Sequence, residues 1–553
     1  MTDHQSARHR TLASVSRFGP PQMPIWTSFD TYRRPITWCA AFFSLTFFFN
    51  AAASVAEDGS IVEPFGSHPQ AMKWLAQELT KAQVARPLLV VWLLDETKSM
   101  ETDFHETAET VHRVYGELHK DTQSVVISFG TGTHVRTNEP VATTPTGFSR
   151  LRKAFDRKPT DESGKENLCK AVLFAIDKFS EQANENRQQL LIIAVTNESP
   201  SDSGDTAADP NLLEQTIKQC QKSKVPVYLL GRESTFGKPW ARIAWKDPVF
   251  QLTHWVWIHR GPDSALPARL AWNGRGKSLD NTLSGFGPYS QERLCHATSG
   301  GFFLLLPSGN VVGFRNRRAA LASYHPVLVD RKTEQLAISQ SPFRASCQFV
   351  IESLDPALDA RLILRETFST TNFDDEAQQD LTNAEYAWAK LNAAITQLAS
   401  VRPLREPEPS KRWQANYDLL YAQCLAFRVR LVQYMLALDN HRQQSPAAST
   451  TKHNKWMLGQ SIAPLLEPSI DQFSRLNKLC HPLEARDDFV IRMQNDRAAA
   501  QQAIDQVIAA HPDSPWATVA EIEKRHSFGL KLRSYFHDPR YQHVGKKVKA
   551  PSF

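Results

Sequence analysis

Apolar and polar positions follow two patterns along the first 306 residues of the chain. From Pro87 to Leu306, short and fully apolar runs alternate with stretches whose apolar residues recur every three to four positions. The first pattern predicts strands buried on both faces, and the second predicts amphipathic helices. We therefore predict a doubly wound α/β domain over residues 87–306. Its mostly parallel sheet should have six strands in the order 3-2-1-4-5-6, with one antiparallel edge. The expected strands lie at 88–94, 124–129, near 135, 190–195, 225–230 and 301–306.

A long connection without a helical pattern interrupts this domain at residues 231–288. Such length is uncommon in a compact domain and is often functional. The segment contains Trp240, Trp245, Trp255, Trp257 and Trp272. We expect residues 255–258 to form one strand of a hairpin added to the edge of the sheet, and the tryptophans to pack the insertion onto the domain.

The C-terminal third contains several stretches with helical periodicity, and residues 441–455 between them have the pattern of a loop or linker. Residues 376–401 and 413–438 each carry apolar side chains at steps of three and four, and a proline-rich break separates them. We predict that they pair as antiparallel helices, with Trp388 and Phe427 buried between them. Residues 373–550 should thus form an all-α domain, joined to the sheet domain by a connecting region at 307–372. The helix pairing weakly resembles that of tetratricopeptide repeats, although no period of about 34 residues is present.

Composition excludes several classes of protein. The 553 residues are 41% apolar and 22% charged, as in an ordinary globular protein. The net charge of +6 is small for this length, and no basic face is interleaved with aromatics, so nucleic acid is not an expected partner. No segment beyond the N-terminal region is apolar enough for a stable transmembrane anchor.

The N-terminal region has the order of an export signal. Arg33 and Arg34 precede the uncharged stretch 36–53, and small residues follow at 54–56. We assign 1–56 to a signal region, with Met23 as an alternative start, and 57–86 to a lead-in. The mature protein should be periplasmic, on the cell surface or extracellular. Cleavage would leave six widely spaced cysteines, which we expect to be buried free thiols: Cys169, Cys220, Cys295, Cys347, Cys424 and Cys480.

The candidate chemistry lies directly after the first predicted strand. Asp95, Thr97 and Ser99 alternate in a loop between a buried strand and a helix, where doubly wound folds place their ligands. A carboxylate and two hydroxyls are hard oxygen ligands that suit magnesium, manganese or calcium. The alternative is that Thr97 and Ser99 only cap the helix.

Here the sequence resembles the von Willebrand factor A family, whose metal site uses the pattern Asp-x-Ser-x-Ser, with Thr accepted in the middle. The likeness extends to residues 297–303, which resemble the family's entry to the last strand. The resemblance implies two further ligand loops, one with Thr and one with Asp. The matching positions are Glu166 and Asn197, so both depart from the family pattern while still offering oxygen.

The resemblance implies a metal-binding protein that holds an acidic side chain of a protein partner, with no catalytic residues. Glu198 and Asp202 are possible auxiliary ligands or a solvated acidic loop. Glu166 is longer than Thr and could occupy the partner's position. A metal-free scaffold whose helical domain binds the partner is the alternative function. A hydrolase is disfavoured, because neither a phosphate-binding loop nor a nucleophile elbow is present.

Overall fold

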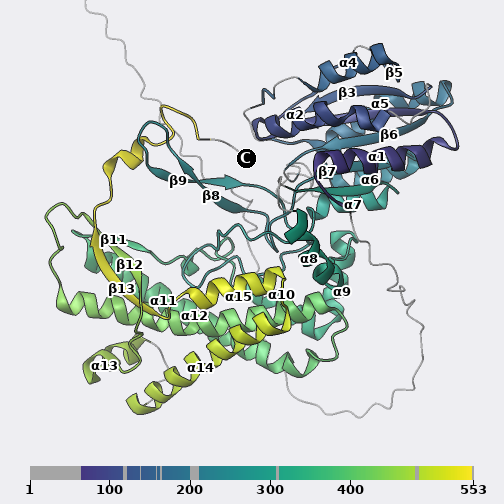
Figure 1. Cartoon of the computed structure of the whole chain (residues 1–553). Helices are drawn as coiled ribbons and strands as arrows, with labels where there is room; N and C mark the ends of the chain where they lie inside the picture. Colours follow the sequence, from purple (N-terminus) through teal and green to yellow (C-terminus); the bar gives the residue numbers. More distant parts are fainter. Residues whose placement is uncertain are drawn as a thin grey trace, which may run out of the picture. The chain divides into compact units, whose positions relative to one another are not determined.

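A mostly parallel sheet dominates the N-terminal half of the chain in the computed structural model (Figure 1). The structure describes residues 64–115, 121–137, 139–156, 159–161, 165–197, 199, 211–306, 311–479 and 485–550. The strands of the sheet are β1 (Phe65–Gly66), β2 (Leu88–Asp95), β3 (Gln123–Phe129), β4 (Thr133–Val135), β5 (Val141–Ala142), β6 (Gln189–Val195), β7 (Val227–Gly231) and β10 (Gly301–Leu305).

The strand order is β1-β10-β7-β6-β2-β3-β4, with β5 paired to β3. The predicted order of the six main strands is confirmed, and β4 provides the antiparallel edge. The short strands β1 and β5 were not predicted. Strand β1 belongs to the lead-in before β2, pairs parallel with β10 and forms the edge opposite β4, whereas β5 pairs antiparallel with β3.

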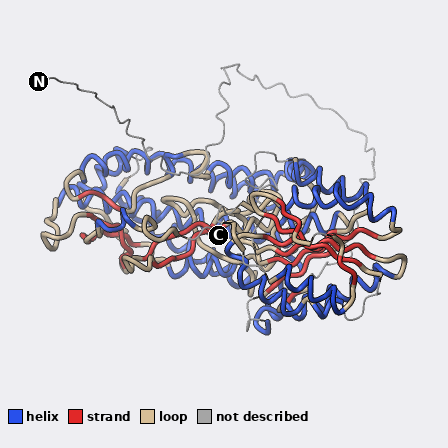
Figure 2. Tube along the Cα trace, turned by 90° about the horizontal axis from the view of Figure 1, so that it is seen from above, coloured by secondary structure: helices blue, strands red, loops and turns tan. Residues whose placement is uncertain are grey.

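Helices cover both faces of the sheet (Figure 2). All eight residues of β2 are buried, and alternate residues face opposite layers: Leu89 and Val91 pack under one layer, and Val90 and Trp92 under the other. This two-sided burial explains the continuous apolar run. One layer contains α5 (Leu168–Glu185), α6 (Leu212–Ser223) and α7 (Tyr289–Ala297). The other contains α1 (His68–Gln83), α2 (Glu101–Thr110), α3 (His112–Tyr115) and α4 (Pro145–Phe155).

The insertion after β7 forms a hairpin of β8 (Ala241–Lys246) and β9 (Thr253–Ile258). The hairpin itself is confirmed, but its expected addition to the edge of the main sheet is wrong, because β8 and β9 form a separate two-stranded sheet. The physical reason is that β1 and β4 already occupy the two edges.

The helical region follows in the order α8 (Val311–Leu321), α9 (Arg331–Gln340), α10 (Pro342–Ser353), α11 (Phe373–Val401), α12 (Lys411–Gln444), α13 (Ile470–Leu479), α14 (Arg486–Ala510) and α15 (Pro515–Arg525). The predicted antiparallel pair is confirmed in α11 and α12. The Tyr417 hydroxyl donates to the Leu398 carbonyl at 3.0 Å, and the Tyr434 hydroxyl donates to Asp380 at 2.6 Å. The end of α11 thus lies beside the start of α12, and the start of α11 lies beside the later part of α12, as in an antiparallel pair.

Phe427 is buried as predicted, although against the insertion and not between the paired helices, and the predicted burial is wrong for Trp388, which is only half-buried. The Phe427 ring packs on Trp272 of the insertion, with ring centroids 5.7 Å apart. This arrangement arises because α12 is a central helix that is covered by α11, α14, α15 and the insertion together.

The region also contains a small antiparallel sheet that the sequence pattern did not reveal. It consists of β11 (Thr367–Ser369), β12 (Lys455–Ser461) and β13 (Gly529–Tyr535). These strands are short and come from three distant parts of the chain, so no local sequence pattern indicates their pairing.

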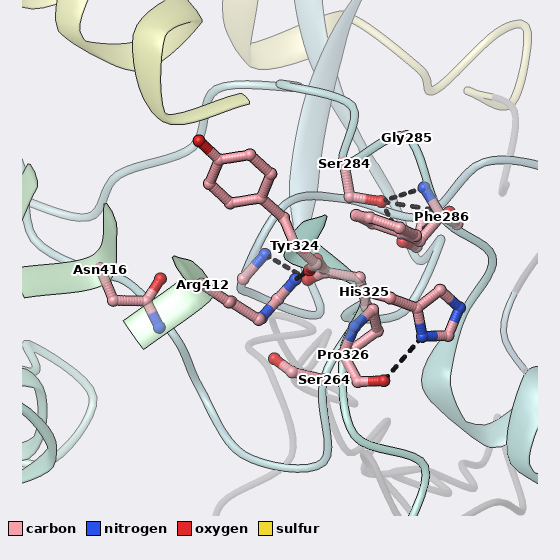
Figure 3. A network of polar contacts seen from close by, with 12 residues as sticks. Ser264, Ser284, Gly285, Phe286, Tyr324, His325, Pro326, Arg412 and Asn416 are labelled. Atoms are coloured by element: carbon pink, nitrogen blue, oxygen red, sulfur yellow. Dashed lines mark hydrogen bonds and ion pairs between the residues drawn. The ribbon is translucent and has the colours of Figure 1, made fainter. Parts of the chain in front are cut away.

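The insertion is fastened to the helical region and not only to the sheet. Arg412 at the start of α12 forms an ion pair with Asp263 at 2.7 Å, and both side chains are nearly inaccessible to solvent. The same arginine donates to the Tyr324 carbonyl at 3.2 Å, in the polar network of Figure 3. Trp272 is fully buried and donates to the Leu362 carbonyl at 2.9 Å.

The expectation that the insertion's tryptophans pack it onto the sheet domain is therefore wrong for Trp240, Trp255, Trp257 and Trp272, and no contact of Trp245 with the described part of the sheet supports it. Trp272 packs on the helical region instead, Trp240, Trp255 and Trp257 are exposed, and Trp245 is half-buried on the hairpin.

The cysteines follow the sequence expectation where they can be seen. Cys169, Cys220, Cys295, Cys347 and Cys424 are buried free thiols, while Cys480 and the signal region 1–56 lie outside the described residues. Among the helices that the structure describes, none is both long and apolar enough to cross a membrane.

Candidate functional site

The loop after β2 carries the first three candidate residues. Asp95 is the last residue of the strand and is completely buried. Its Oδ1 atom accepts a hydrogen bond from the Thr97 amide at 2.9 Å, which turns the loop back toward the carboxylate. The hydroxyls of Thr97 and Ser99 lie 3.0 Å apart. Thr97 occupies the N-cap of a short 3-10 turn, but its side chain makes no capping bond, so the capping alternative does not describe this residue.

Two other loops bring their polar side chains to the same place. Glu166 precedes α5, Asn197 follows β6, and both belong to the carboxyl edge of the sheet. The Ser99 hydroxyl donates to the Asn197 Oδ1 atom at 3.1 Å, and the carboxyl groups of Asp95 and Glu166 are in hydrogen-bond contact. The predicted convergence of Asp95, Glu166 and Asn197 is confirmed as geometry.

Thr196 joins the two carboxyl groups and was not identified from the sequence. Its hydroxyl donates to Asp95 Oδ2 at 2.8 Å and lies 3.5 Å from Glu166 Oε2. Its position next to Asn197, at the end of a buried strand, was the available signal. The auxiliary candidates Glu198 and Asp202 lie outside the described residues.

Burial shapes the electrostatics of this site. Removal from water raises the pKa of Asp95 to about 6, from an ordinary value of 3.8, and the hydrogen bonds from Thr97 and Thr196 only partly oppose the rise. The ionised form of Asp95 is therefore unfavourable in the folded chain. A cation at this position would favour that form, because opposite charge lowers the pKa of a carboxyl group.

The donor set fits a hard divalent cation. In octahedral coordination with metal–oxygen bonds of about 2.1 Å, neighbouring ligand oxygens lie about 3.0 Å apart. The Thr97–Ser99 and Ser99–Asn197 oxygen pairs, at 3.0 and 3.1 Å, match that spacing. Within the described residues, no group of three or more His, Cys, Asp or Glu side chains is placed to hold a metal. A cation here would thus depend on hydroxyl and amide oxygens beside two carboxylates.

Polar contacts behind the loop hold it in place. The buried Glu96 forms an ion pair with Arg136 and accepts hydrogen bonds from Ser128 and Thr160, both at 2.9 Å. The Arg136 charge and the two hydroxyl donors together outweigh burial and hold the pKa of Glu96 below its ordinary value. The Asp161 amide donates to the Glu96 carbonyl at 3.0 Å, which ties the loop before α5 to the loop after β2.

The base of the insertion adjoins the third ligand loop. The Ser199 amide donates to the His259 carbonyl at 3.1 Å, and the His259 ring packs on Trp240 with centroids 4.5 Å apart. The hairpin β8–β9 therefore begins beside the loop that carries Asn197.

These features define a doubly wound α/β domain with a polar, oxygen-rich site at the carboxyl edge of its sheet, followed by a helix-rich region. Residues 90–255 match the family model of the von Willebrand factor type A domain. This match covers most of β2, all of β3, β6, β7 and β8, and the candidate site, and it ends within β9.

Other comparisons add little. No curated protein matches the sequence. The human COPII-coat protein Sec24c is 8% identical over 43% of this chain, with a TM-score of 0.23, and the match spans 31% of that protein. Glycerol dehydrogenase from Schizosaccharomyces pombe is 8% identical over 80% of this chain and 90% of its own length, with a TM-score of 0.18. Neither likeness is close enough to support an argument.

Proposed function

We propose that this chain is an exported, non-catalytic binding protein that holds a divalent cation at its sheet edge and uses it to bind an acidic side chain of a protein partner. The von Willebrand factor type A domain supports a role in protein interaction. The observation that carries the metal proposal is the meeting of three loops at one point, with oxygen spacings of 3.0 and 3.1 Å. The proposed ligands are Asp95, Thr97, Ser99, Glu166 and Asn197.

Each residue has a distinct part in this proposal. Thr97 and Ser99 supply neutral oxygens and are oriented by each other. Asp95 and Glu166 supply two negative charges when ionised. Because both side chains are buried, water does not solvate these charges, and a bound cation would stabilise them. Magnesium, or alternatively manganese or calcium, would supply a positively charged position at which an anionic ligand can bind.

Glu166 decides how open the site is. It stands where the family has Thr, yet it is only 3% exposed and contacts Asp95. It therefore turns inward, toward the carboxylate, and leaves the solvent side of the site for a partner.

Titration of the metal-depleted chain with magnesium tests the proposal. We expect heat of binding and a raised melting temperature at millimolar metal for the natural chain, and neither for Asp95→Asn or Ser99→Ala. Asp177→Asn is the control, since Asp177 is exposed on α5. If magnesium produces no heat and no melting shift in the natural chain, the metal proposal is wrong.

A second candidate function is favoured by a groove in the helical region. This open groove of about 760 Å³ lies between α12 and the strands β12 and β13, with Gln433, His441, Trp456, Lys531 and Arg533 among its lining residues. Helix-lined grooves bind partner helices or extended peptides, as the weak tetratricopeptide likeness also suggests. The sheet domain would then be a metal-free scaffold.

The two binding sites are best separated in the full chain. Trp272 and Phe286 of the insertion share a core with α11 and α12, so a fragment without the helices would expose them. Loss of partner binding in Asp95→Asn, with retention in Arg533→Glu, supports the sheet edge. The reverse result assigns the partner to the groove.

A further inference from the structure

The β8–β9 hairpin presents an aromatic and basic face to solvent. In its register Arg242 lies opposite Trp257, and Ala244 lies opposite Trp255. Because strand side chains alternate, these four residues share one face, while Val256 and Ile258 point to the buried face. Trp240, Trp255 and Trp257 are 39%, 52% and 45% exposed, and they are the exposed tryptophans of the described residues.

The aromatic rings of this face are held by contacts with one another and with arginine. The Arg242 guanidinium lies 5.7 Å from the ring centroids of both Trp255 and Trp257. Trp240 packs edge-on against Trp257, with centroids 6.4 Å apart. The tryptophans therefore form a contiguous exposed aromatic cluster, and exposed apolar patches of this kind mark interaction surfaces.

The C-terminal segment adds lysines at the tip of the hairpin. The Gly545 amide donates to Asp247 in the β8–β9 turn at 3.1 Å, and the Lys547 ammonium lies 5.7 Å from the Phe250 ring. The neighbouring Lys546 and Lys549 are exposed, as are the aliphatic side chains at 249 and 548. We name Trp240, Arg242, Lys246, Val249, Trp255, Trp257, Lys546, Lys547, Val548 and Lys549 the tryptophan–lysine face.

The charge of this face is mostly positive, and the exposed Glu366 is an acidic neighbour of Arg242. Strands β8 and β9 contain Arg242 and Lys246 and no acidic residue. The acidic residue of the turn, Asp247, is buried and accepts hydrogen bonds from three backbone amides, those of Val249, Phe250 and Gly545. The excess of positive charge favours an anionic partner, and the exposed rings favour one that also has an apolar layer.

We propose that the tryptophan–lysine face docks the protein onto an anionic lipid surface. Tryptophan favours the boundary between lipid and water, and lysines near a membrane are attracted by anionic headgroups. Reversible attachment needs two such signals, which are both present here. Several exposed lysines side by side suit the diffuse charge of a lipid layer, whereas acidic groups of a protein are more often held by bidentate arginines.

Vesicle binding of the full chain tests this inference. We expect partition onto vesicles of phosphatidylglycerol and phosphatidylcholine, and much weaker partition onto phosphatidylcholine alone. Each lysine near an anionic surface contributes roughly fivefold, so the triple variant Lys546→Gln, Lys547→Gln and Lys549→Gln should bind about a hundredfold more weakly. A matched control replaces three exposed lysines of the sheet domain, namely Lys73→Gln, Lys218→Gln and Lys222→Gln.

Lipid contact of the rings gives a second measurement. Brominated lipids should quench the tryptophan fluorescence of the natural chain, and quenching should fall in the double variant Trp255→Phe and Trp257→Phe. The inference is overturned if anionic vesicles do not bind the chain, or if both lysine triples weaken binding equally. It is also overturned if soluble polyglutamate binds this face while vesicles do not, because the surface then serves an acidic protein.

Discussion

Replacing Asp95 by Asn should stabilise the metal-free protein at neutral pH. Asn has nearly the same shape and can keep the hydrogen bond from the Thr97 amide, but it carries no charge. The buried Asp95 has a pKa of about 6 in the folded chain, against an ordinary value of 3.8. Folding therefore opposes ionisation of this group.

The size of the effect follows from that difference in pKa. Because the folded pKa is raised, the contribution of Asp95 to stability is fully present below pH 3.8 and is lost as the pH rises through about 6. Each tenfold change in proton affinity is worth about 1.4 kcal/mol, so ionisation costs the folded chain about 3 kcal/mol above pH 6. Magnesium at a hundred times its dissociation constant would return about 2.7 kcal/mol in the natural chain.

Urea denaturation between pH 4 and pH 8 measures both effects. In metal-free buffer, the natural chain should lose stability relative to Asp95→Asn as the pH rises from 4 to 7. Saturating magnesium should remove most of that difference at pH 7. Asp177→Asn should follow the natural chain throughout, because its carboxyl group is exposed.

Two results would refute the reasoning. If the difference in the free energy of unfolding between the natural chain and Asp95→Asn does not change from pH 4 to pH 7, ionisation of Asp95 does not destabilise the folded chain. If magnesium stabilises Asp95→Asn as much as the natural chain, the cation binds elsewhere.

Two further predictions concern the site and the insertion. Glu166→Thr introduces the residue that the von Willebrand factor A family has at the matching position, so magnesium should still bind by calorimetry. Partner affinity should stay unchanged, because Glu166 turns inward and already leaves the solvent side open. Loss of magnesium binding would show that the charge of Glu166 is required. Arg412→Met leaves Asp263 buried without its ion-pair partner, which should lower the free energy of unfolding by about 3–5 kcal/mol in urea denaturation. Adding Asp263→Asn should recover part of that loss, and no recovery would contradict the ion-pair explanation.

The local pattern of the sequence was enough for the architecture of the sheet and for the candidate loop. The run 88–95 is apolar up to its last residue, and only a strand covered on both faces buries such a run. The spacing of Asp95, Thr97 and Ser99 after that strand placed them at the carboxyl edge, where Glu166 and Asn197 also lie. The periodicity of 376–401 and 413–438 likewise predicted two helices that pair. These features are local, so a short window of residues encodes them.

Only the tertiary structure determines which element of the chain covers each apolar side chain or strand. The sequence pattern does not distinguish the tryptophans of the insertion from one another, yet Trp272 is buried against α12 while Trp255 and Trp257 face solvent. The strands β11, β12 and β13 are short and distant in sequence, so no window contains their pairing. Thr196 shares a contact with Asp95 and Glu166 only because three loops meet. Periodicity states that a face is apolar, whereas the element that covers it depends on how the whole chain packs.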